Sequence, residues 1–221
     1  MLVSVLAAIA QVDVRRMLAF HVVGQVAYLM MGLALASRQG SAAAIFYTMH
    51  TMLVQTGLFL GAGAIARASG GYDLRVLGGL IHEHPRFSVL FAVLALSISG
   101  VPPLSGFWAK ALVIDAAFRS GTSGAWLLVT VALATGFLTL YSMSVLWTQT
   151  FWRPRKRAGH MARPIPPAMI ASVALLAACT LGLGLAIEPA VRLSRTAAAQ
   201  LTPSAAALNG AMPAGAAGAP R

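Results

Sequence analysis

Residues 94–111, LALSISGVPPLSGFWAKA, decide the fold of this chain. A long apolar run is interrupted here by glycine and proline, and it resumes about one turn before a single lysine, Lys110. Proline has no backbone N–H and cannot continue the hydrogen-bond ladder of a helix, and glycine loosens the same region. The residues that break the helix are Gly100, Pro102, Pro103 and Gly106.

The composition places the chain in a lipid bilayer. Hydrophobic residues make up 58% of the 221 residues and charged residues 10%, whereas soluble domains average about 25% charged residues. The net charge of +11 is also typical of nucleic-acid binding. The basic residues, however, lie between long apolar runs and not on one polar face, so we expect no nucleic-acid partner.

The lengths of the apolar runs predict an all-α protein. A membrane-spanning helix needs about 20 apolar residues, and four continuous runs reach that length: 17–37, 42–66, 126–151 and 167–187. The run 86–119 contains the break, and 2–10 is only half as long. We therefore predict a polytopic transmembrane helical bundle with one discontinuous helix. Residues 1–188 would form this domain, and the Ala/Pro/Gly-rich segment 189–221 is expected to be a disordered tail.

The basic residues predict how the bundle is oriented. If the run 86–119 crosses the membrane once, ten basic residues fall on one side. They are Arg15, Arg16, Arg67, Arg75, Arg86, Arg153, Arg155, Lys156, Arg157 and Arg163. A re-entrant hairpin would instead separate the loop 152–164 from the others. The positive-inside rule favours the single crossing and makes this loop cytoplasmic, as expected for a multi-pass protein of the cell inner (plasma) membrane.

Lys110 is the strongest candidate for chemistry. Free backbone groups at membrane depth persist only where they are buried in protein or line a wet cavity, and a lysine there costs about 3 kcal/mol or more. A lysine can instead extend its ammonium to the membrane surface. Lys110 is nine residues from Arg119, about 13 Å of helix, so we interpret it as a proton-carrying residue.

Four further polar residues lie within the predicted spans. His50 and Gln55 lie in the run 42–66, and His21 and Gln25 share one helix face at i and i+4. A histidine can relay protons because its ordinary pKa is near neutral. It can equally hydrogen-bond a neighbouring helix, and the residues alone leave both readings open.

Two charged groups lie outside the spans. Asp13 and Arg15 precede the second run, where an acid at a helix start offsets the helix dipole. A structural role and a role at the entrance of a proton path are both open. The short cluster His82, Glu83 and His84 is interpreted as a solvated turn, and we expect no metal site.

Three stretches resemble a known family. Residues 10–33 (AQVDVRRMLAFHVVGQVAYLMMGL), 43–65 (AAIFYTMHTMLVQTGLFLGAGAI) and 96–113 (LSISGVPPLSGFWAKALV) are similar to the C-terminal half of the proton-pumping antiporter-like membrane subunits. That family includes the Mrp-type sodium/proton antiporter subunits and the large membrane subunits of respiratory complex I, and the resemblance is strongest to the D-type subunit of the Mrp antiporters. It extends over about residues 8–118.

The resemblance implies roles for individual positions. Lys110 matches the lysine of the family's second broken helix, at the outward end of the proton path. The positions that match earlier parts of that path are Asp13, Arg15, His21, Gln25 and His50. Two positions depart from the family: Thr51 stands where a second histidine is common, and Gln55 stands where the relay has a lysine.

We therefore expect a truncated or split component, similar to the D-type Mrp subunit, of a multisubunit monovalent cation (Na⁺)/proton antiporter, with protons passing from His50 and Gln55 to Lys110. Its partners would be other antiporter subunits, lipid, protons and Na⁺ or another monovalent cation. We expect no cofactor and no enzymatic reaction of its own. Two alternatives remain: a proton-translocating subunit of a complex I-like NADH-quinone oxidoreductase, and a structural remnant that transports nothing.

Overall fold

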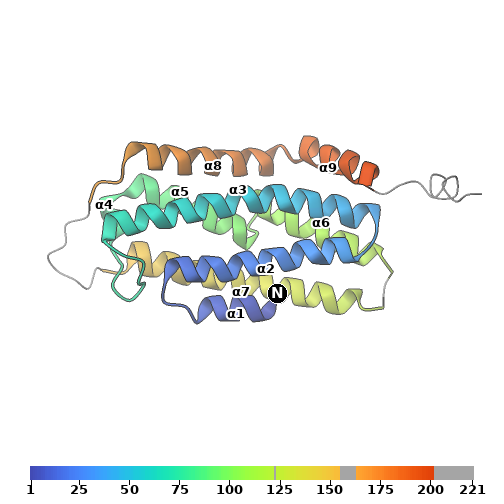
Figure 1. Cartoon of the computed structure of the whole chain (residues 1–221), viewed down its shortest axis with the longest axis horizontal. Helices are drawn as coiled ribbons and strands as arrows, with labels where there is room; N and C mark the ends of the chain where they lie inside the picture. The colour runs from blue at the N-terminus through green and yellow to red at the C-terminus, as the bar shows by residue number, and fades with distance from the viewer. Residues whose placement is uncertain (122, 155–162, 202–221) are drawn as a thin grey trace, which may run out of the picture.

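The computed structural model describes residues 1–121, 123–154 and 163–201, and every regular element within them is helical. The chain begins with the short helix α1 (Leu2–Ile9), followed by α2 (Val14–Ala34) and α3 (Arg38–Ser69). The later elements are α4 (Leu80–Glu83), α5 (Pro85–Ser99), α6 (Ser105–Arg119), α7 (Ala125–Trp147), the π-helix η1 (Thr148–Trp152), α8 (Pro167–Leu185) and α9 (Ile187–Leu201). Figure 1 shows the helices running along one common long axis.

Four helices are long and apolar enough to cross a membrane: α2, α3, α7 continued by η1, and α8. They confirm the four continuous runs read from the sequence, with ends that differ by a few residues. Trp126 and Trp152, at opposite ends of α7–η1, are 71% and 63% exposed. Tryptophan prefers the two membrane–water interfaces, as expected for side chains at the two ends of a spanning helix.

The interrupted run is a broken helix, as predicted. α5 ends at Ser99, Gly100 follows with φ +90°, and α6 begins at Ser105. In Figure 1, α5 and α6 occupy opposite halves of the long axis. Pro102 and Pro103 lie in the exposed connection between the two helices, where neither is required to donate a backbone hydrogen bond.

The prediction of a disordered tail from residue 189 is wrong as far as Leu201, because α9 occupies Ile187–Leu201. Small side chains recurring every fourth residue, Ala190, Ser194 and Ala198, are buried where α9 packs on α3. Small residues let two helix backbones approach closely, and Val191 is the one larger apolar side chain of α9 that is buried beside them. Residues 202–221 of the expected tail lie outside the described residues.

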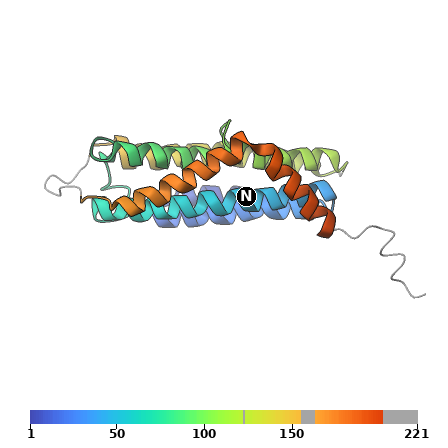
Figure 2. The same cartoon turned by 90° about the horizontal axis from the view of Figure 1, so that it is seen from above.

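Seen from above, α8 and α9 meet at an angle over the middle of the bundle (Figure 2). The junction lies against the break between α5 and α6. A Cβ on Gly184 of α8 would lie 2.5 Å from the carbonyl oxygen of Pro103 and 2.7 Å from the nitrogen of Ser105. Glycine at position 184 is therefore what allows the two interrupted segments to touch.

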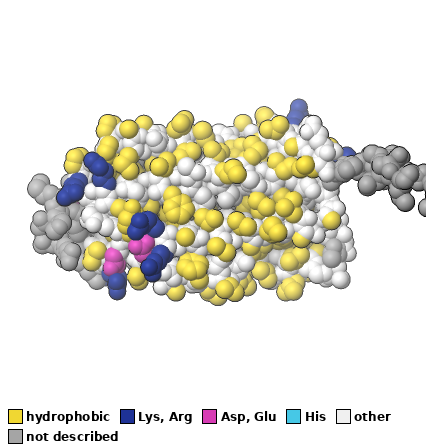
Figure 3. Space-filling model, in the orientation of Figure 1, with side chains coloured by type: hydrophobic (Ala, Val, Ile, Leu, Met, Phe, Trp, Pro, Cys, Tyr) yellow, Lys and Arg dark blue, Asp and Glu magenta, His cyan; other side chains and the backbone are white. Residues whose placement is uncertain are grey.

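Charged side chains gather near the ends of the molecule, and hydrophobic side chains cover the middle (Figure 3). The start of α2, the end of α3, the starts of α5 and α8, and the end of η1 share one end in Figure 1, which is the end that the sequence predicts to be basic. Arg155, Lys156 and Arg157 of the predicted cytoplasmic loop lie outside the described residues.

Candidate functional site

Lys110 bridges the break in the helix. Its ammonium donates hydrogen bonds to the carbonyl oxygens of Ile98, at 3.0 Å, and Ser99, at 2.8 Å. These carbonyls belong to the last turn of α5, where the helix offers no N–H partner and carries partial negative charge. The lysine is only 8% exposed, so a buried cation is stabilised here by the end of a helix.

Glycines bring the two half-helices into contact. A Cβ on Gly106 would overlap the carbonyl oxygen of Ser97 and lie 3.0 Å from Cε1 of His50. A Cβ on Gly100 would lie 3.0 Å from Cδ of Lys110, and the positive φ at this position also favours glycine. The predicted helix-breaking residues therefore shape the surroundings of the lysine as well as ending α5.

His50 reaches the same break from α3. Its Nδ1 lies 2.8 Å from the hydroxyl of Ser105, the first residue of α6. The Ser105 hydroxyl in turn lies 3.3 Å from the hydroxyls of Ser97 and Thr180. All four side chains are at most 1% exposed, so α3, α5, α6 and α8 meet in one buried polar cluster.

Two tyrosines connect His50 with Lys110. The Lys110 ammonium lies 5.6 Å from the centre of the Tyr28 ring, a distance at which a cation is attracted to an aromatic face. Tyr28 stacks on Tyr47 with ring centres 5.4 Å apart, and the Tyr47 ring meets His50 edge-on at 6.0 Å. Tyr47 also donates a hydrogen bond to Gln25 of α2. Neither tyrosine was predicted from the sequence as a site residue.

His21 and Gln25 share a buried face of α2, but they contact different neighbours. Nε2 of His21 lies 2.8 Å from the hydroxyl of Ser142 in α7, whereas Gln25 contacts Tyr47 in α3. The polar face predicted for α2 is therefore present, and it divides between two helices.

Gln55 does not join the cluster around the break. Its amide nitrogen and oxygen are buried and form no hydrogen bond to any part of the chain that the structure describes, and the same holds for the Thr51 hydroxyl. These are the two positions at which the sequence departs from the family pattern. A glutamine without a partner fits poorly in a dry interior, because each unsatisfied polar atom costs about 1–3 kcal/mol.

Asp13 and Arg15 hold the start of α2. The Asp13 carboxylate accepts hydrogen bonds from the backbone N–H groups of Arg15, at 2.9 Å, and Arg16, at 3.1 Å, as an N-cap residue does. The Arg15 guanidinium lies 3.8 Å above the ring of Tyr72. Both residues line an open cavity of about 620 Å³ at this end of the bundle. Asp13 is therefore the N-cap of α2, which is the structural one of the two roles that the sequence left open for it.

The same cavity contains the exposed pair Asp73 and Arg75. The Arg75 guanidinium donates hydrogen bonds to the Asp73 carboxylate at 2.9 Å and 3.0 Å. These hydrogen bonds and the positive charge of Arg75 hold the pKa of Asp73 below its ordinary value. Asp73 is thereby kept ionised at neutral pH.

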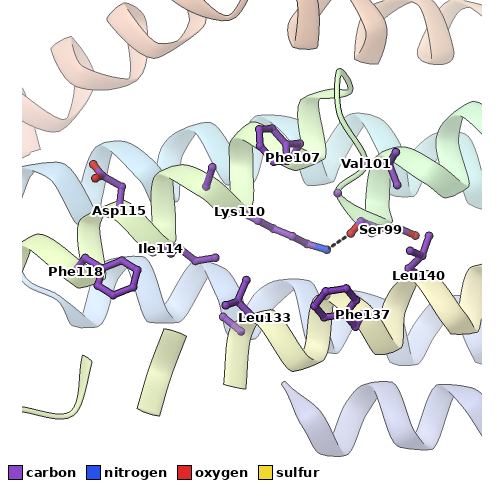
Figure 4. A pocket seen from close by; sticks show the side chains of 14 residues that line it. Ser99, Val101, Phe107, Lys110, Ile114, Asp115, Phe118, Leu133, Phe137 and Leu140 are labelled. Carbon is purple, nitrogen blue, oxygen red and sulfur yellow. Dashed lines mark hydrogen bonds between the residues drawn. The ribbon is translucent and has the colours of Figure 1, made fainter. Parts of the chain in front are cut away.

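Lys110 also faces a cavity of about 530 Å³ between α6 and α7. Most of its walls are apolar, with Phe107, Phe118 and Phe137 among the lining residues. Figure 4 shows the Lys110 side chain extended towards Ser99 at one end of the cavity, with Asp115 at the other end. A buried ammonium beside such a space can exchange a proton with water.

The serine and threonine partners of the site were not predicted from the sequence. Ser105, Ser142 and Thr180 contact the predicted histidines directly or through one hydroxyl. Hydroxyl residues are common within apolar helices, where most of them hydrogen-bond their own backbone. The useful signal was positional: Ser105 follows the two prolines after a single leucine, Leu104, and begins the second half-helix.

Comparisons with known proteins identify the family. Residues 1–139 match the family described as NADH:quinone oxidoreductase/Mrp antiporter, transmembrane. The chain is 38% identical over 201 residues to the D-type subunit of the Na⁺/H⁺ antiporter of Alkalihalophilus pseudofirmus, covering 91% of this chain and 40% of the relative. It is 35% identical over 190 residues to an N-type subunit of the NADH-quinone oxidoreductase of Acidobacterium capsulatum, covering 84% and 37%.

A solved structure agrees with these relatives. The chain superposes with a TM-score of 0.82 and 33% identity on a chain of the Mrp complex from Dietzia sp. DQ12-45-1b, covering 90% of this chain and 45% of that one. The chain thus spans less than half the length of the proteins that it matches.

Proposed function

Because the chain belongs to the NADH:quinone oxidoreductase/Mrp antiporter transmembrane family, we propose that it contributes part of a transmembrane proton path to a multisubunit Na⁺/H⁺ antiporter. The observation that carries this proposal is the buried ammonium of Lys110, held by the free carbonyl end of a broken helix. The antiporter reading is favoured over the complex I-like one because the match to the D-type antiporter subunit is higher in identity and covers more of this chain.

Lys110 can alternate between two states. As an ammonium it is attracted to the partial negative charge at the end of α5 and donates to Ile98 and Ser99. As a neutral amine it keeps hydrogen-bonding capacity but loses the charge–dipole attraction. The hold of α6 on α5 therefore depends on whether the proton is present, and this dependence couples proton transfer to the geometry of the broken helix.

In this proposal His50 supplies the protons that reach Lys110. It contacts Ser105 on the first turn of α6, and the rings of Tyr47 and Tyr28 lie between it and Lys110. These ring contacts carry no proton, so the proton itself passes through hydroxyl groups and water. Hydroxyl groups donate and accept at once, so Ser105 and Thr180 can pass a proton between neighbours. Gln55 cannot titrate, and in this proposal it contributes polarity only.

Lys110→Ala in the assembled complex tests the proposal. Proton movement is followed with a pH-sensitive dye in everted membrane vesicles after Na⁺ is added, and the amount of assembled complex is measured in the same vesicles. We expect Na⁺-dependent proton movement to disappear while assembly persists. Lys110→Met, which keeps most of the side-chain volume, guards against loss of packing. Unchanged transport in both variants would favour a purely structural subunit.

The orientation is part of the same proposal. We place the end that contains Arg15, Arg67, Arg75 and Arg153 in the cytoplasm, because basic residues are retained on that side during insertion. In this arrangement Lys110 lies on the outward half of the broken helix, and its partners are the other subunits of the antiporter and the surrounding lipid of the plasma membrane.

A further inference from the structure

Asp115 lies where two cavities meet. It lines the cavity of about 530 Å³ that contains Lys110, and it also lines a second cavity of about 480 Å³. The second cavity is formed by the beginning of α3, the last turns of α6 and the middle of α9, with Arg38 and Arg195 on its walls. These helix segments lie together at one end of the bundle, opposite the end that contains the start of α2 and the end of α3 (Figure 1).

The carboxylate of Asp115 is held in place at this junction. The Arg119 Nε lies 2.9 Å from both of its oxygens, one turn further along α6. The Asp115 side chain is 53% exposed, so the pair remains open to solvent. Asp115 therefore lines both the cavity that contains Lys110 and the cavity at the outer end of the molecule, and its carboxylate is turned away from Lys110 (Figure 4).

We propose that Asp115 receives protons released by Lys110 and delivers them to the outward surface, an inference that rests on the proposed function. The Lys110 ammonium gives one proton to water in the first cavity and becomes a neutral amine. The proton passes through that water to the Asp115 carboxylate, which becomes a carboxylic acid. Asp115 then releases the proton to water in the second cavity and returns to the carboxylate, so charge and protons balance.

The spacing of the two residues requires water between them. Five residues of α-helix separate Lys110 from Asp115 along the chain, about 7.5 Å of rise, and the Lys110 side chain extends the other way, towards Ser99 (Figure 4). A direct hydrogen bond is therefore excluded in this arrangement. The shared cavity supplies the route, and its apolar walls limit where water can go.

Glu188 offers a matched control for the experiment. Its carboxylate pairs with Arg192 at 2.9 Å, also at i and i+4 and also exposed, but it lines neither cavity. Asp115→Asn and Glu188→Gln each remove one charge and leave one arginine without its partner. The assay measures Na⁺-dependent proton movement by the assembled complex in vesicles, together with the amount of complex.

We expect Asp115→Asn to slow proton movement at least about tenfold, a modest share of the 10²–10⁴-fold typical of a positioned acid–base group. Glu188→Gln should leave the rate within about twofold, because general acid–base roles depend on position. Asp115→Glu, which restores the carboxylate, should recover transport. The proposal is overturned if Asp115→Asn transports normally while Lys110→Ala does not, or if Asp115→Glu is as slow as Asp115→Asn. Normal transport by both Asp115→Asn and Lys110→Ala would instead overturn the proposed function.

Discussion

Gly106→Ala should destabilise the break between α5 and α6. The added Cβ overlaps the carbonyl oxygen of Ser97, a backbone atom that cannot rotate away. It also lies 2.8 Å from the carbonyl carbon of Ser97 and 3.0 Å from Cε1 of His50, whereas carbon atoms prefer about 3.5–4.0 Å. α5 must therefore move away from α6 by several tenths of an ångström or more.

The expected loss of stability in Gly106→Ala has two contributions. Overpacking costs about 1–3 kcal/mol, and moving α5 also weakens the bonds from Lys110 to Ile98 and Ser99, each worth about 1.5–3 kcal/mol when a charged group donates. A total of about 3 kcal/mol is a conservative expectation. At about 2–4 °C per kcal/mol for a chain of this size, the unfolding midpoint should fall by about 6–12 °C.

Heating in detergent, followed by size-exclusion chromatography of the protein that remains folded, measures this midpoint. Gly182→Ala is the control, because Gly182 lies inside α8 and no described atom falls within 4 Å of its added Cβ. Gly182→Ala should raise the unfolding midpoint or leave it unchanged, because alanine is about 1 kcal/mol more favourable than glycine inside a helix. A midpoint for Gly106→Ala equal to that of the parent protein would refute the close contact between Gly106 and Ser97.

Two further changes test other parts of the molecule. Gln55→Leu removes two buried polar atoms that have no partner among the described residues. The unfolding midpoint should therefore rise by about 2–4 °C for each kcal/mol of stability recovered. A fall in the midpoint would mean that the Gln55 amide is hydrogen-bonded. In a Cys179→Ser background, an impermeant maleimide applied to intact cells should label Gly124→Cys and leave Gly71→Cys unlabelled, and the reverse pattern would invert the orientation. At both glycines no described atom lies within 4 Å of an added Cβ.

The membrane spans could be predicted because length and hydrophobicity are local properties of the sequence. α2, α3, α7 and α8 begin and end within a few residues of the expected runs, and the break was visible as glycine and proline inside one apolar run. α9 was missed for a physical reason. It packs through small side chains and Val191, and its exposed face carries the Glu188–Arg192 pair, so its sequence does not resemble the apolar runs that identify a span.

The site could be predicted only in part, because its partners come from distant helices. Lys110 and His50 were found as polar residues within apolar runs, and both lie at the break. Nothing in the sequence indicates that His50 meets Ser105, 55 residues away, or that Tyr28 and Tyr47 lie between it and Lys110. Such pairings depend on how helices rotate about their own axes, which packing decides.

The contact of Gly184 with Pro103 and Ser105 has a mechanical consequence. It places two discontinuities, one between α5 and α6 and one between α8 and α9, at the same level of the bundle. α2, α3 and α7 continue past that level as unbroken helices. α8 and α9 both pack on α3, one of these unbroken helices, so the contact at Gly184 anchors the start of α6, and with it the half-helix that carries Lys110, to a helix that crosses the whole bundle.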